Sequence, residues 1–253
     1  MKAAVQFAPN DATRARAYFI MGNALVMQGE QKKERYQDAE RALREALRLA
    51  PEENNIRFAL GRALLKMSRD EDGIAELKQY LANDPKAYYA RVASRYIENP
   101  RRARELFIPQ FTLTTLDGQY RSSEDLVGKV VVFDFWATWC GPCRMAIGEL
   151  RELAKKFRNE PVVVLSISAD SNEGTLRKFI QSEKMDWPQY WDRDHRLRSL
   201  FGVNAFPTYL VVDQEGIMRK LQTGAGGFQL DVVEGQIKKL LKQARKQEPA
   251  TQN

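Results

Sequence analysis

The chain has 253 residues, long enough for one large domain or two modest ones that each bury a core. Its net charge of +7 divides into +3 for the first hundred residues and +4 for the rest, with both signs interspersed, so we expect a solvated surface and no nucleic-acid partner. No stretch approaches the roughly 20 apolar residues of a membrane-spanning helix, and we recognise neither an export signal nor an anchor.

The first hundred residues are predicted to be helical throughout. Apolar residues recur there at helical spacing, and Pro51 and Pro85, which each follow a predicted helix, lie 34 residues apart. In two of these helices a glycine follows an apolar residue at a corresponding place, at Gly22 and at Gly61. The apolar spacing predicts helices over residues 18–27, 39–49, 56–67, 74–81 and 88–97.

This pattern resembles tetratricopeptide (TPR) repeats, in which small residues let paired helices pack closely. The resemblance covers about two repeats over residues 13–85, with 88–97 as a capping helix and extra residues near 31–36. Residues 3–10 resemble the tail of an earlier repeat, so we expect the chain to begin inside a longer natural protein. We assign residues 1–99 to this all-α domain, which with so few repeats is expected to depend on the next domain for stability.

A second domain is predicted for residues 105–247, followed by a disordered tail at 248–253. Asp117-Gly118 has the chemistry of a hairpin turn between two short strands. Residues 130–136 and 162–168 are rich in β-branched side chains and predict buried strands, each followed by a helical pattern. A second hairpin and a basic amphipathic helix complete the order, which predicts an α/β fold with a mixed central sheet and an N-terminal β-hairpin.

The two cysteines of the chain, Cys140 and Cys143, stand where a predicted strand leads into a predicted helix. Free N–H groups and the dipole at a helix start stabilise a thiolate, which lowers the Cys140 pKa below its ordinary value of ~8.5. Pro142 suits a helix start because its missing N–H would be unpaired there anyway. Cys143 lies one helical turn further on, so the two sulfurs can form a disulfide and release a mixed disulfide made with a substrate.

Three other interpretations of the cysteine pair are weaker. A zinc site needs two more ligands, but the chain has no third cysteine, and its one histidine, His195, lies at a charged helix start where a solvated or capping role is expected. We therefore predict no metal and no cofactor. A purely structural disulfide across so short a loop would stabilise little. Two inert buried thiols would leave the strand–C-x-x-C–helix arrangement unexplained.

The segment 132–144, which contains Cys-Gly-Pro-Cys, resembles the active-site region of thioredoxins. The leading hairpin and the sequence FPTYLVVDQEG resemble more closely the TlpA/ResA type of thioredoxin-like protein, over about residues 111–246. The resemblance implies a bacterial periplasmic or other extracytoplasmic protein that reduces protein disulfides, for example during cytochrome c maturation, with electrons from an upstream thiol donor. A cytoplasmic location is the alternative, because export rests on the resemblance alone.

Carried over residue by residue, the resemblance makes Cys140 the attacking cysteine and Cys143 the resolving one. Asp134 matches the buried acid of thioredoxins, whose raised pKa would let it take the Cys143 proton; a satisfied structural aspartate is the other interpretation. Asp170 falls near an acid that such proteins use beside the active site, although a surface aspartate at a helix start is favoured. Pro207 matches the cis-proline that faces the dithiol, with an ordinary trans proline as the alternative.

The predicted substrate contacts surround the dithiol. Trp139 is expected to form apolar surface beside Cys140, whereas Trp136 is expected to pack in the core. The backbone of Phe206 is expected to pair with an extended substrate segment. The full set of predicted substrate-binding residues is Trp139, Gly141, Pro142, Phe206 and Thr208.

The sequence thus predicts a thiol–disulfide oxidoreductase that reduces protein disulfides, with the repeats docking a client or a partner protein. One alternative is a repeat scaffold with an inert thioredoxin fold, which would have no reason to keep both cysteines. The other is a peroxidase-like enzyme, which should turn over hydroperoxide through a sulfenic acid at Cys140.

Overall fold

The computed structural model describes residues 8–224 and 227–247, and the chain divides into two compact units, Met1–Glu105 and Leu106–Asn253. The predicted tail at 248–253 lies outside the described residues, as does most of the predicted remnant of an earlier repeat at 3–10. Within the described part of the chain, no helix is both long enough and apolar enough to cross a bilayer.

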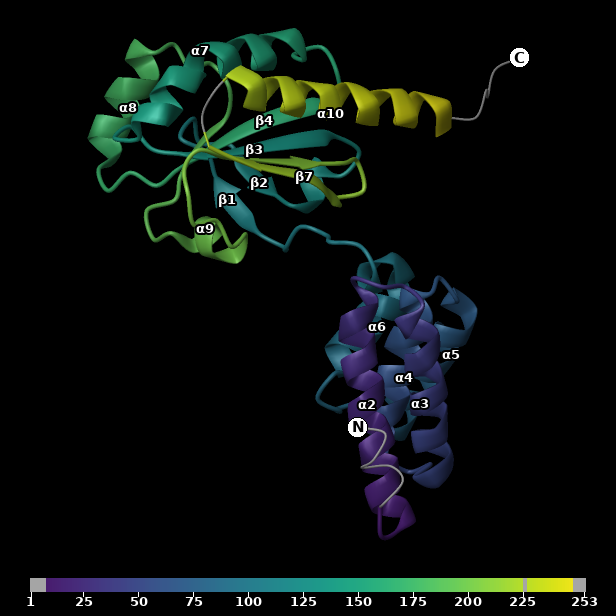
Figure 1. The fold of residues 1–253 in the computed structure, drawn as a ribbon. Helices are drawn as coiled ribbons and strands as arrows, with labels where there is room; N and C mark the ends of the chain where they lie inside the picture. The colour runs from purple at the N-terminus through teal and green to yellow at the C-terminus, as the bar shows by residue number, and fades with distance from the viewer. Residues whose placement is uncertain (1–7, 225–226, 248–253) are drawn as a thin grey trace. The chain divides into compact units, whose positions relative to one another are not determined.

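The first unit is all helical, as predicted. Helix α2 packs beside α3, and α4 packs beside α5, so that two helix–turn–helix pairs follow one another (Figure 1). Pro51 and Pro85 each stand two residues beyond the end of the second helix of a pair. The elements are α2 (Asp11–Gly29), α3 (Arg35–Leu49), α4 (Asn54–Lys66), α5 (Asp70–Asn83), α6 (Ala90–Glu98) and the 3-10 turn η1 (Pro100–Ala103).

Glycines mark the places where the paired helices approach most closely. A Cβ atom at Gly22 would lie 2.5 Å from Leu43 Cγ, and one at Gly61 would lie 2.8 Å from Leu77 Cγ. Such separations are far below normal contact between carbon atoms, so any larger residue would push the helices apart. Both leucines are fully buried, and the small residues therefore serve the close packing predicted from the repeat pattern.

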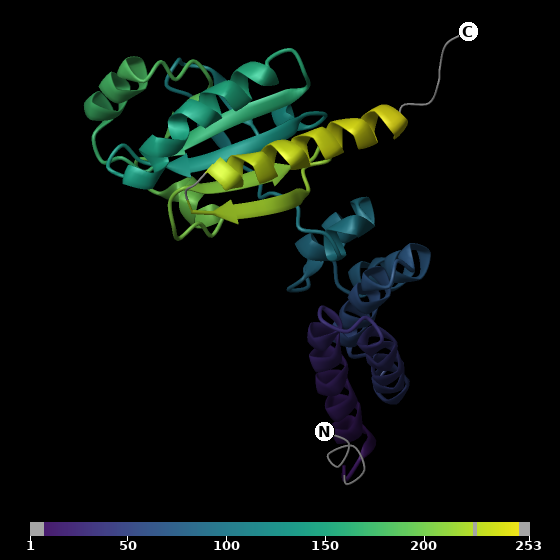
Figure 2. The ribbon, with the colours of Figure 1, turned by 45° about the horizontal axis from the view of Figure 1, so that its top comes forward.

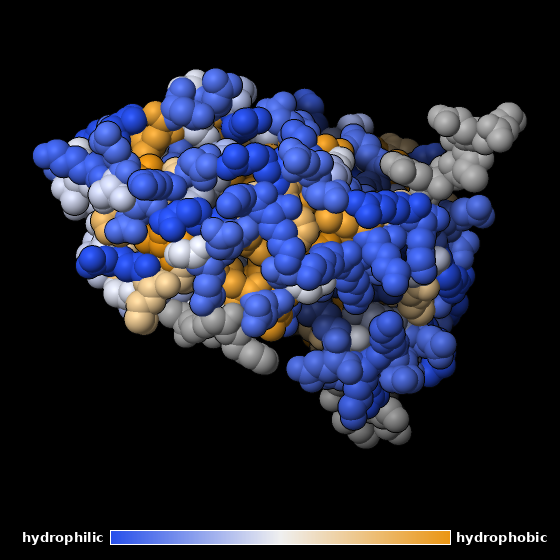
Figure 3. Space-filling view, turned by 90° about the horizontal axis from the view of Figure 1, so that it is seen from above, coloured by the Kyte–Doolittle hydropathy of each residue, from blue (hydrophilic) through white to orange (hydrophobic). Residues whose placement is uncertain are grey.

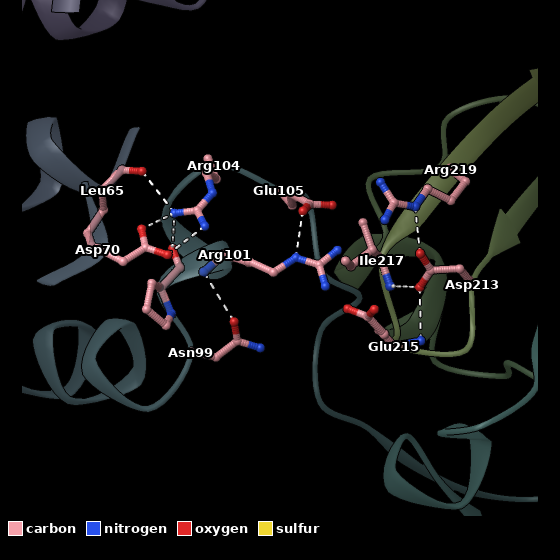
Figure 4. Close-up of polar contacts among 11 residues, drawn as sticks. Leu65, Asp70, Asn99, Arg101, Arg104, Glu105, Asp213, Glu215, Ile217 and Arg219 are labelled. Atoms are coloured by element: carbon pink, nitrogen blue, oxygen red, sulfur yellow. Dashed lines mark hydrogen bonds and ion pairs between the residues drawn. The ribbon is translucent and has the colours of Figure 1, made fainter. Parts of the chain in front are cut away.

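Arg104 ties the end of the helical unit to its second helix pair (Figure 4). Its guanidinium donates to Asp70 Oδ1 at 2.6 Å and Oδ2 at 2.8 Å, and to the backbone oxygen of Leu65 at 3.0 Å. The fork of an arginine matches a carboxylate in this two-pronged way. The bond to Leu65 adds a second donor to a carbonyl near the C-terminus of α4 that also accepts the Ser68 N–H.

An Arg104→Ala variant is expected to lower the free energy of opening of α4 and α5 by about 1 kcal/mol, because the partly exposed Asp70 carboxylate loses its partner and the Leu65 carbonyl loses one of its two donors. Native-state hydrogen exchange of the amides in these helices measures this quantity in the intact chain. Arg14→Ala, which breaks the more exposed pair with Asp11, serves as the control and should change exchange little. Equal effects of the two variants would contradict the assignment.

The second unit has the predicted α/β fold. Its five-stranded sheet has the order β5-β4-β3-β6-β7, with β3, β4 and β5 parallel and with β6 and β7 antiparallel to their neighbours. Strands β1 and β2 form a separate hairpin, whose turn contains Gly118 at φ 84°. The short strand β5 was not predicted, whereas α9 begins at the charged helix start expected around His195. The elements are β1 (Thr112–Thr114), β2 (Tyr120–Ser122), η2 (Glu124–Leu126), β3 (Val130–Trp136), α7 (Gly141–Lys156), β4 (Val162–Ser168), α8 (Glu173–Ser182), β5 (Gln189–Trp191), α9 (Arg196–Leu200), β6 (Thr208–Val212), β7 (Met218–Thr223) and α10 (Gly227–Gln247).

The central strand β3 is buried on both faces and divides its side chains between two cores. Val130, Val132 and Trp136 belong to the core under α7 and α10, and the intervening Val131, Phe133 and Phe135 belong to the opposite core. Figure 2 shows α7 and α10 lying along the same face of the sheet. Seen from above, the surface is largely hydrophilic with apolar side chains in patches between (Figure 3). Asp134 shares the alternation of the first set, so it faces the α7 and α10 core.

Candidate active site

The two cysteines lie where β3 ends and α7 begins. Cys140 is the N-cap residue of α7, and its Sγ accepts a hydrogen bond from the Cys143 N–H at 3.2 Å. The sulfur thus occupies the place of a capping oxygen, among the free N–H groups of the first turn. Pro142 lies in that turn, as the sequence predicted. Cys140 and Cys143 are joined by a disulfide with an S–S distance of 2.07 Å and Cα atoms 5.2 Å apart.

Aromatic side chains lie beside the disulfide. Trp139 is 66% exposed, whereas Trp136 is buried in the core, as the sequence predicted for both. The Trp139 ring meets Phe206 edge to face, with ring centroids 5.8 Å apart. Arg198, on α9, also contacts Phe206: its guanidinium carbon lies 5.8 Å from the Phe206 ring centroid. The segment before Pro207 is therefore placed against the active-site turn.

The segment 205–208 opens strand β6. The Phe206–Pro207 peptide bond is cis, as expected from the resemblance. Thr208 is buried, and its hydroxyl donates to the backbone oxygen of Ala205 at 2.8 Å. The Thr208 side chain therefore holds this turn in shape, and the Thr208 backbone lies within the sheet, between Phe135 on β3 and Thr223 on β7.

Asp134 is a buried carboxyl on the same face of the sheet as Cys143. It is 3% exposed, and its Oδ2 accepts a hydrogen bond from the Ser166 hydroxyl at 2.7 Å. Burial raises the pKa of Asp134 to about 7, although the bond from Ser166 acts in the opposite direction. Tyr209 pairs with Asp134 in the strand register, and burial followed by the Asp134 charge raises its pKa. A carboxyl that titrates near neutrality can both accept and return a proton.

Asp170 is buried, which contradicts the favoured expectation of a surface aspartate. Its carboxylate accepts the Thr138 N–H at 3.0 Å, the Thr138 hydroxyl at 2.5 Å and the Ser168 hydroxyl at 2.7 Å. Thr138 stands two residues before Cys140, so these bonds fix the loop that carries the attacking sulfur. The Trp191 indole N–H donates to the Asp170 backbone oxygen at 2.5 Å and holds the acceptor itself in place.

An Asp170→Ala variant is expected to lose about 3 kcal/mol of unfolding free energy, because the buried Ser168 hydroxyl and two partly buried donors of Thr138 lose their acceptor. Insulin reduction should fall about tenfold through misplacement of the Cys140 loop. Asp170→Asn keeps an acceptor oxygen and should recover part of both losses, and Asp194→Ala, at an exposed site, is the control. Urea unfolding and the rate of Cys140 alkylation test the prediction, which fails if Asp170→Ala matches the wild type.

Comparison with known proteins agrees with this geometry. A model of the AhpC/TSA family matches residues 106–221. The chain is similar to the thioredoxin-like protein YneN of Bacillus subtilis, with 31% identity over 118 residues that make up 46% of this chain and 69% of YneN. The chain belongs to the thioredoxin-like thiol-disulfide oxidoreductases of the TlpA/ResA type.

Two further proteins are similar to this chain at somewhat lower sequence identity. The thiol-disulfide oxidoreductase ResA of Bacillus anthracis is 28% identical over 132 residues, which cover 52% of this chain and 75% of ResA. Among solved structures, one described as a thiol:disulfide interchange protein DsbE from Chlorobium tepidum superposes with a TM-score of 0.51 and 27% identity, over 54% of this chain and 96% of that one. A tetratricopeptide-repeat model matches residues 31–96, so this chain is a TlpA/ResA-type protein fused to N-terminal repeats.

Sequence reasoning missed the polar side chains that support the site. Ser166 and Ser168 lie on β4, fully buried in an otherwise apolar strand, and they donate to Asp134 and Asp170 respectively. A signal was present, because a buried hydroxyl requires a hydrogen-bond partner. The partner of Ser166 could not be named, since Asp134 lies 32 residues earlier on β3, whereas Asp170 stands only two residues after Ser168. His195 stands at the N-cap position of α9 but makes no side-chain capping bond.

Proposed function

We propose that this chain reduces protein disulfides, with Cys140 as the attacking thiolate and Cys143 as the resolving thiol. The observation that carries the proposal is the bonding of these two sulfurs in the first turn of α7, beside a core that also holds the Asp134 carboxyl. A dithiol reductant needs a second sulfur within bonding distance and a group that takes the second proton. Cys143 is the candidate for the second sulfur and Asp134 is the candidate for the proton acceptor.

The reaction balances over two exchanges. The Cys140 thiolate attacks one sulfur of the client disulfide, forms a mixed disulfide and expels the other client sulfur as a thiolate, which takes a proton from water. Cys143 then gives its proton to Asp134 and attacks the Cys140 sulfur. This attack breaks the bond between Cys140 and the client and releases the second client thiolate. The client has gained two electrons, and this chain is left with the Cys140–Cys143 disulfide. An upstream thiol donor returns the electrons for the next cycle.

The surroundings of Cys140 fit this role. The first-turn N–H of Cys143 already points at the Cys140 sulfur, and the positive end of the helix dipole favours its thiolate. Trp139 and Phe206 offer apolar contact area to a client, while Gly141 and Pro142 are exposed beside the disulfide. We propose that an extended client segment lies across these residues, beside Thr208 and paired with the backbone at Phe206.

The test of direction is the reduction potential of the Cys140–Cys143 couple. The protein is equilibrated in dithiothreitol or glutathione buffers while fluorescence of Trp136 and Trp139 is followed. A potential near or below about −250 mV supports a reductant of protein disulfides. A potential near about −120 mV identifies an oxidant and overturns the proposed direction.

A thiol peroxidase is the second candidate, because residues 106–221 match the AhpC/TSA family model. In that case Cys140 would pass through a sulfenic acid before Cys143 closes the disulfide. Hydroperoxide consumption by the reduced protein, with chemical trapping of the sulfenic acid in a Cys143→Ser variant, tests this reaction. Rapid hydroperoxide turnover without insulin reduction would favour it over the first proposal.

We further propose that the helical repeats dock the client or a partner protein. Tyr88 is 88% exposed, and Tyr89 and Val92 beside it are also partly exposed, which gives the unit an apolar surface at α6. A Tyr88→Ser variant should weaken reduction of a docked client while insulin reduction stays unchanged. If the wild-type protein binds a partner but does not reduce insulin, a scaffold with an inert thioredoxin fold is favoured instead.

We also propose that the protein works outside the cytoplasm of a bacterial cell. Its clients there would include proteins whose disulfides are reduced during cytochrome c maturation. This proposal is supported by membership of the TlpA/ResA type. Fractionation of cells into periplasmic and cytoplasmic extracts tests it. Recovery with the cytoplasmic extract would support the alternative location.

A further inference from the structure

Three buried side chains form a hydrogen-bonded series that ends at Asp134. The indole N–H of Trp187 donates to Ser166 Oγ at 2.8 Å, and the Ser166 hydroxyl donates to Asp134 Oδ2 at 2.7 Å. Trp187 is 6% exposed, and Ser166 is completely buried. The three residues come from different places in the fold: Trp187 lies just before β5, Ser166 lies on β4 and Asp134 lies on β3.

The chemistry of these groups fixes the direction of the series. An indole N–H can only donate, so the Ser166 oxygen acts as its acceptor. A hydroxyl has one proton, and that proton is left to point at Asp134. Accepting one bond also polarises the hydroxyl and makes it a stronger donor to the next group. The bond from Trp187 therefore favours the orientation of Ser166 in which its proton points at the Asp134 carboxylate.

We propose that Trp187, acting through Ser166, positions a hydroxyl donor that keeps Asp134 ready to take the proton of Cys143. The inference rests on the proposed function, in which Asp134 is the acceptor for the resolving thiol. Ser166 and Trp187 are thus positioning residues, since they act on the client only through Asp134.

The physical effect is a balance between burial and one hydrogen bond. Burial favours the neutral carboxyl, and a hydroxyl that donates to it favours the carboxylate. Without the donor, Asp134 would hold its proton at neutral pH and could accept none from Cys143. The hydrogen bond from Ser166 therefore lowers the pKa of Asp134 toward neutrality, against the effect of burial.

Other titratable groups lie near Asp134 or act on its neighbours, and they must be kept constant in any test. Tyr209 on β6 is the register partner of Asp134, and Glu149 on α7 also acts on Tyr209. Cys143 at the start of α7 belongs to the same core. Ser166 and Trp187 carry no charge, so replacing them adds no new titration to this set.

The chain supplies matched controls for both positions. Ser168 lies two residues along β4 and donates to Asp170 instead of Asp134. Trp191 donates its indole N–H to the backbone oxygen of Asp170. Ser168→Ala and Trp191→Phe thus remove the same chemical groups, at a buried serine and at a half-buried tryptophan, and they leave the series to Asp134 intact.

The experiment titrates Asp134 directly, by carbon-13 NMR of labelled aspartate carboxyls in the oxidised full-length protein, where no thiol titrates alongside it. Ser166→Ala is expected to lower the acid dissociation constant of Asp134 about tenfold, and Trp187→Phe to lower it less. Because Trp187 acts through Ser166, the double variant should match Ser166→Ala alone. Both control variants should leave the Asp134 titration at its wild-type position.

The second readout is the pH profile of the resolving step, followed as release of a mixed disulfide between Cys140 and thionitrobenzoate. Its midpoint should move to higher pH together with the Asp134 titration. An unchanged Asp134 titration in Ser166→Ala, or full additivity in the double variant, overturns the inference. A shifted titration with an unmoved rate profile also overturns it, and locates the fault in the assignment of Asp134 as acceptor. Failure of the wild type to reduce insulin would refute the proposed function separately, since the NMR titration does not depend on it.

Discussion

A Cys143→Ser variant is expected to accumulate a covalent complex with its client. Cys140 can still attack a client disulfide, but no second sulfur is present to release the mixed intermediate. Catalytic reduction of insulin should fall to the uncatalysed rate, while a complex sensitive to dithiothreitol appears on a non-reducing gel. Mass spectrometry of the complex should place the bond at Cys140.

The matched control is Cys140→Ser, which should lose insulin reduction equally and form no complex. Cys143 is 3% exposed and Cys140 is 6% exposed, but only the Cys140 sulfur stands at the N-cap of α7, so Cys143 is not expected to replace it as the attacking sulfur. If Cys140→Ser traps the client and Cys143→Ser does not, the two roles are reversed. If neither variant loses activity, the dithiol is not the site of the reaction.

Asp134→Asn is expected to stabilise the protein at alkaline pH. In the folded chain the pKa of Asp134 is raised from 3.8 to about 7, so the folded state holds this proton more tightly than the unfolded state does. The stability that Asp134 contributes is full below pH 3.8 and is lost as the pH rises through about 7. At about 1.4 kcal/mol per unit, the loss approaches about 4 kcal/mol, and asparagine, which carries no charge, escapes it.

The measurement is the free energy of urea unfolding of both proteins between about pH 3 and pH 8, read as a difference so that other titrations cancel. The unfolding free energy of Asp134→Asn relative to the wild type should rise from about pH 4 to about pH 7 and level off above that. Asp125 supplies a control of opposite sign, because hydrogen bonds from Ser122 lower its pKa. A difference that stays flat with pH would show that Asp134 titrates normally in the folded chain.

The elements with strong local patterns were predictable from the sequence. β3 and β4 agree with their predicted bounds, because each is an unbroken run of residues suited to a doubly buried strand. β5 was missed because its three residues, Gln189–Trp191, form a strand only by pairing with β4. In the helical unit, the glycines at the closest helix contacts were visible in the sequence, and so was the spacing of the two prolines.

The site was only partly predictable, for a physical reason. The cysteines, the buried acid and the proline belong to short segments whose pattern can be recognised locally. The bonds that support them join residues far apart in the chain: Asp170 receives the Thr138 N–H across 32 residues, and Ser166 reaches Asp134 across the same separation. No local pattern in the sequence carries that information. Burial of Asp170 depends on this long-range contact, which is why a surface position was expected instead.

The capping of α7 by the Cys140 sulfur links electron transfer to the helix. A thiolate is a better acceptor for the first-turn N–H than a sulfur already bonded to another, so reduction strengthens the cap. By thermodynamic linkage, any stabilisation of the reduced form by the stronger cap raises the reduction potential of the couple. Each tenfold shift of the equilibrium toward the reduced form raises it by about 30 mV. The reducing power of this chain is therefore a property of the first turn of α7 as well as of its two sulfurs. Its ability to give electrons away will be greatest when that turn binds the thiolate least tightly.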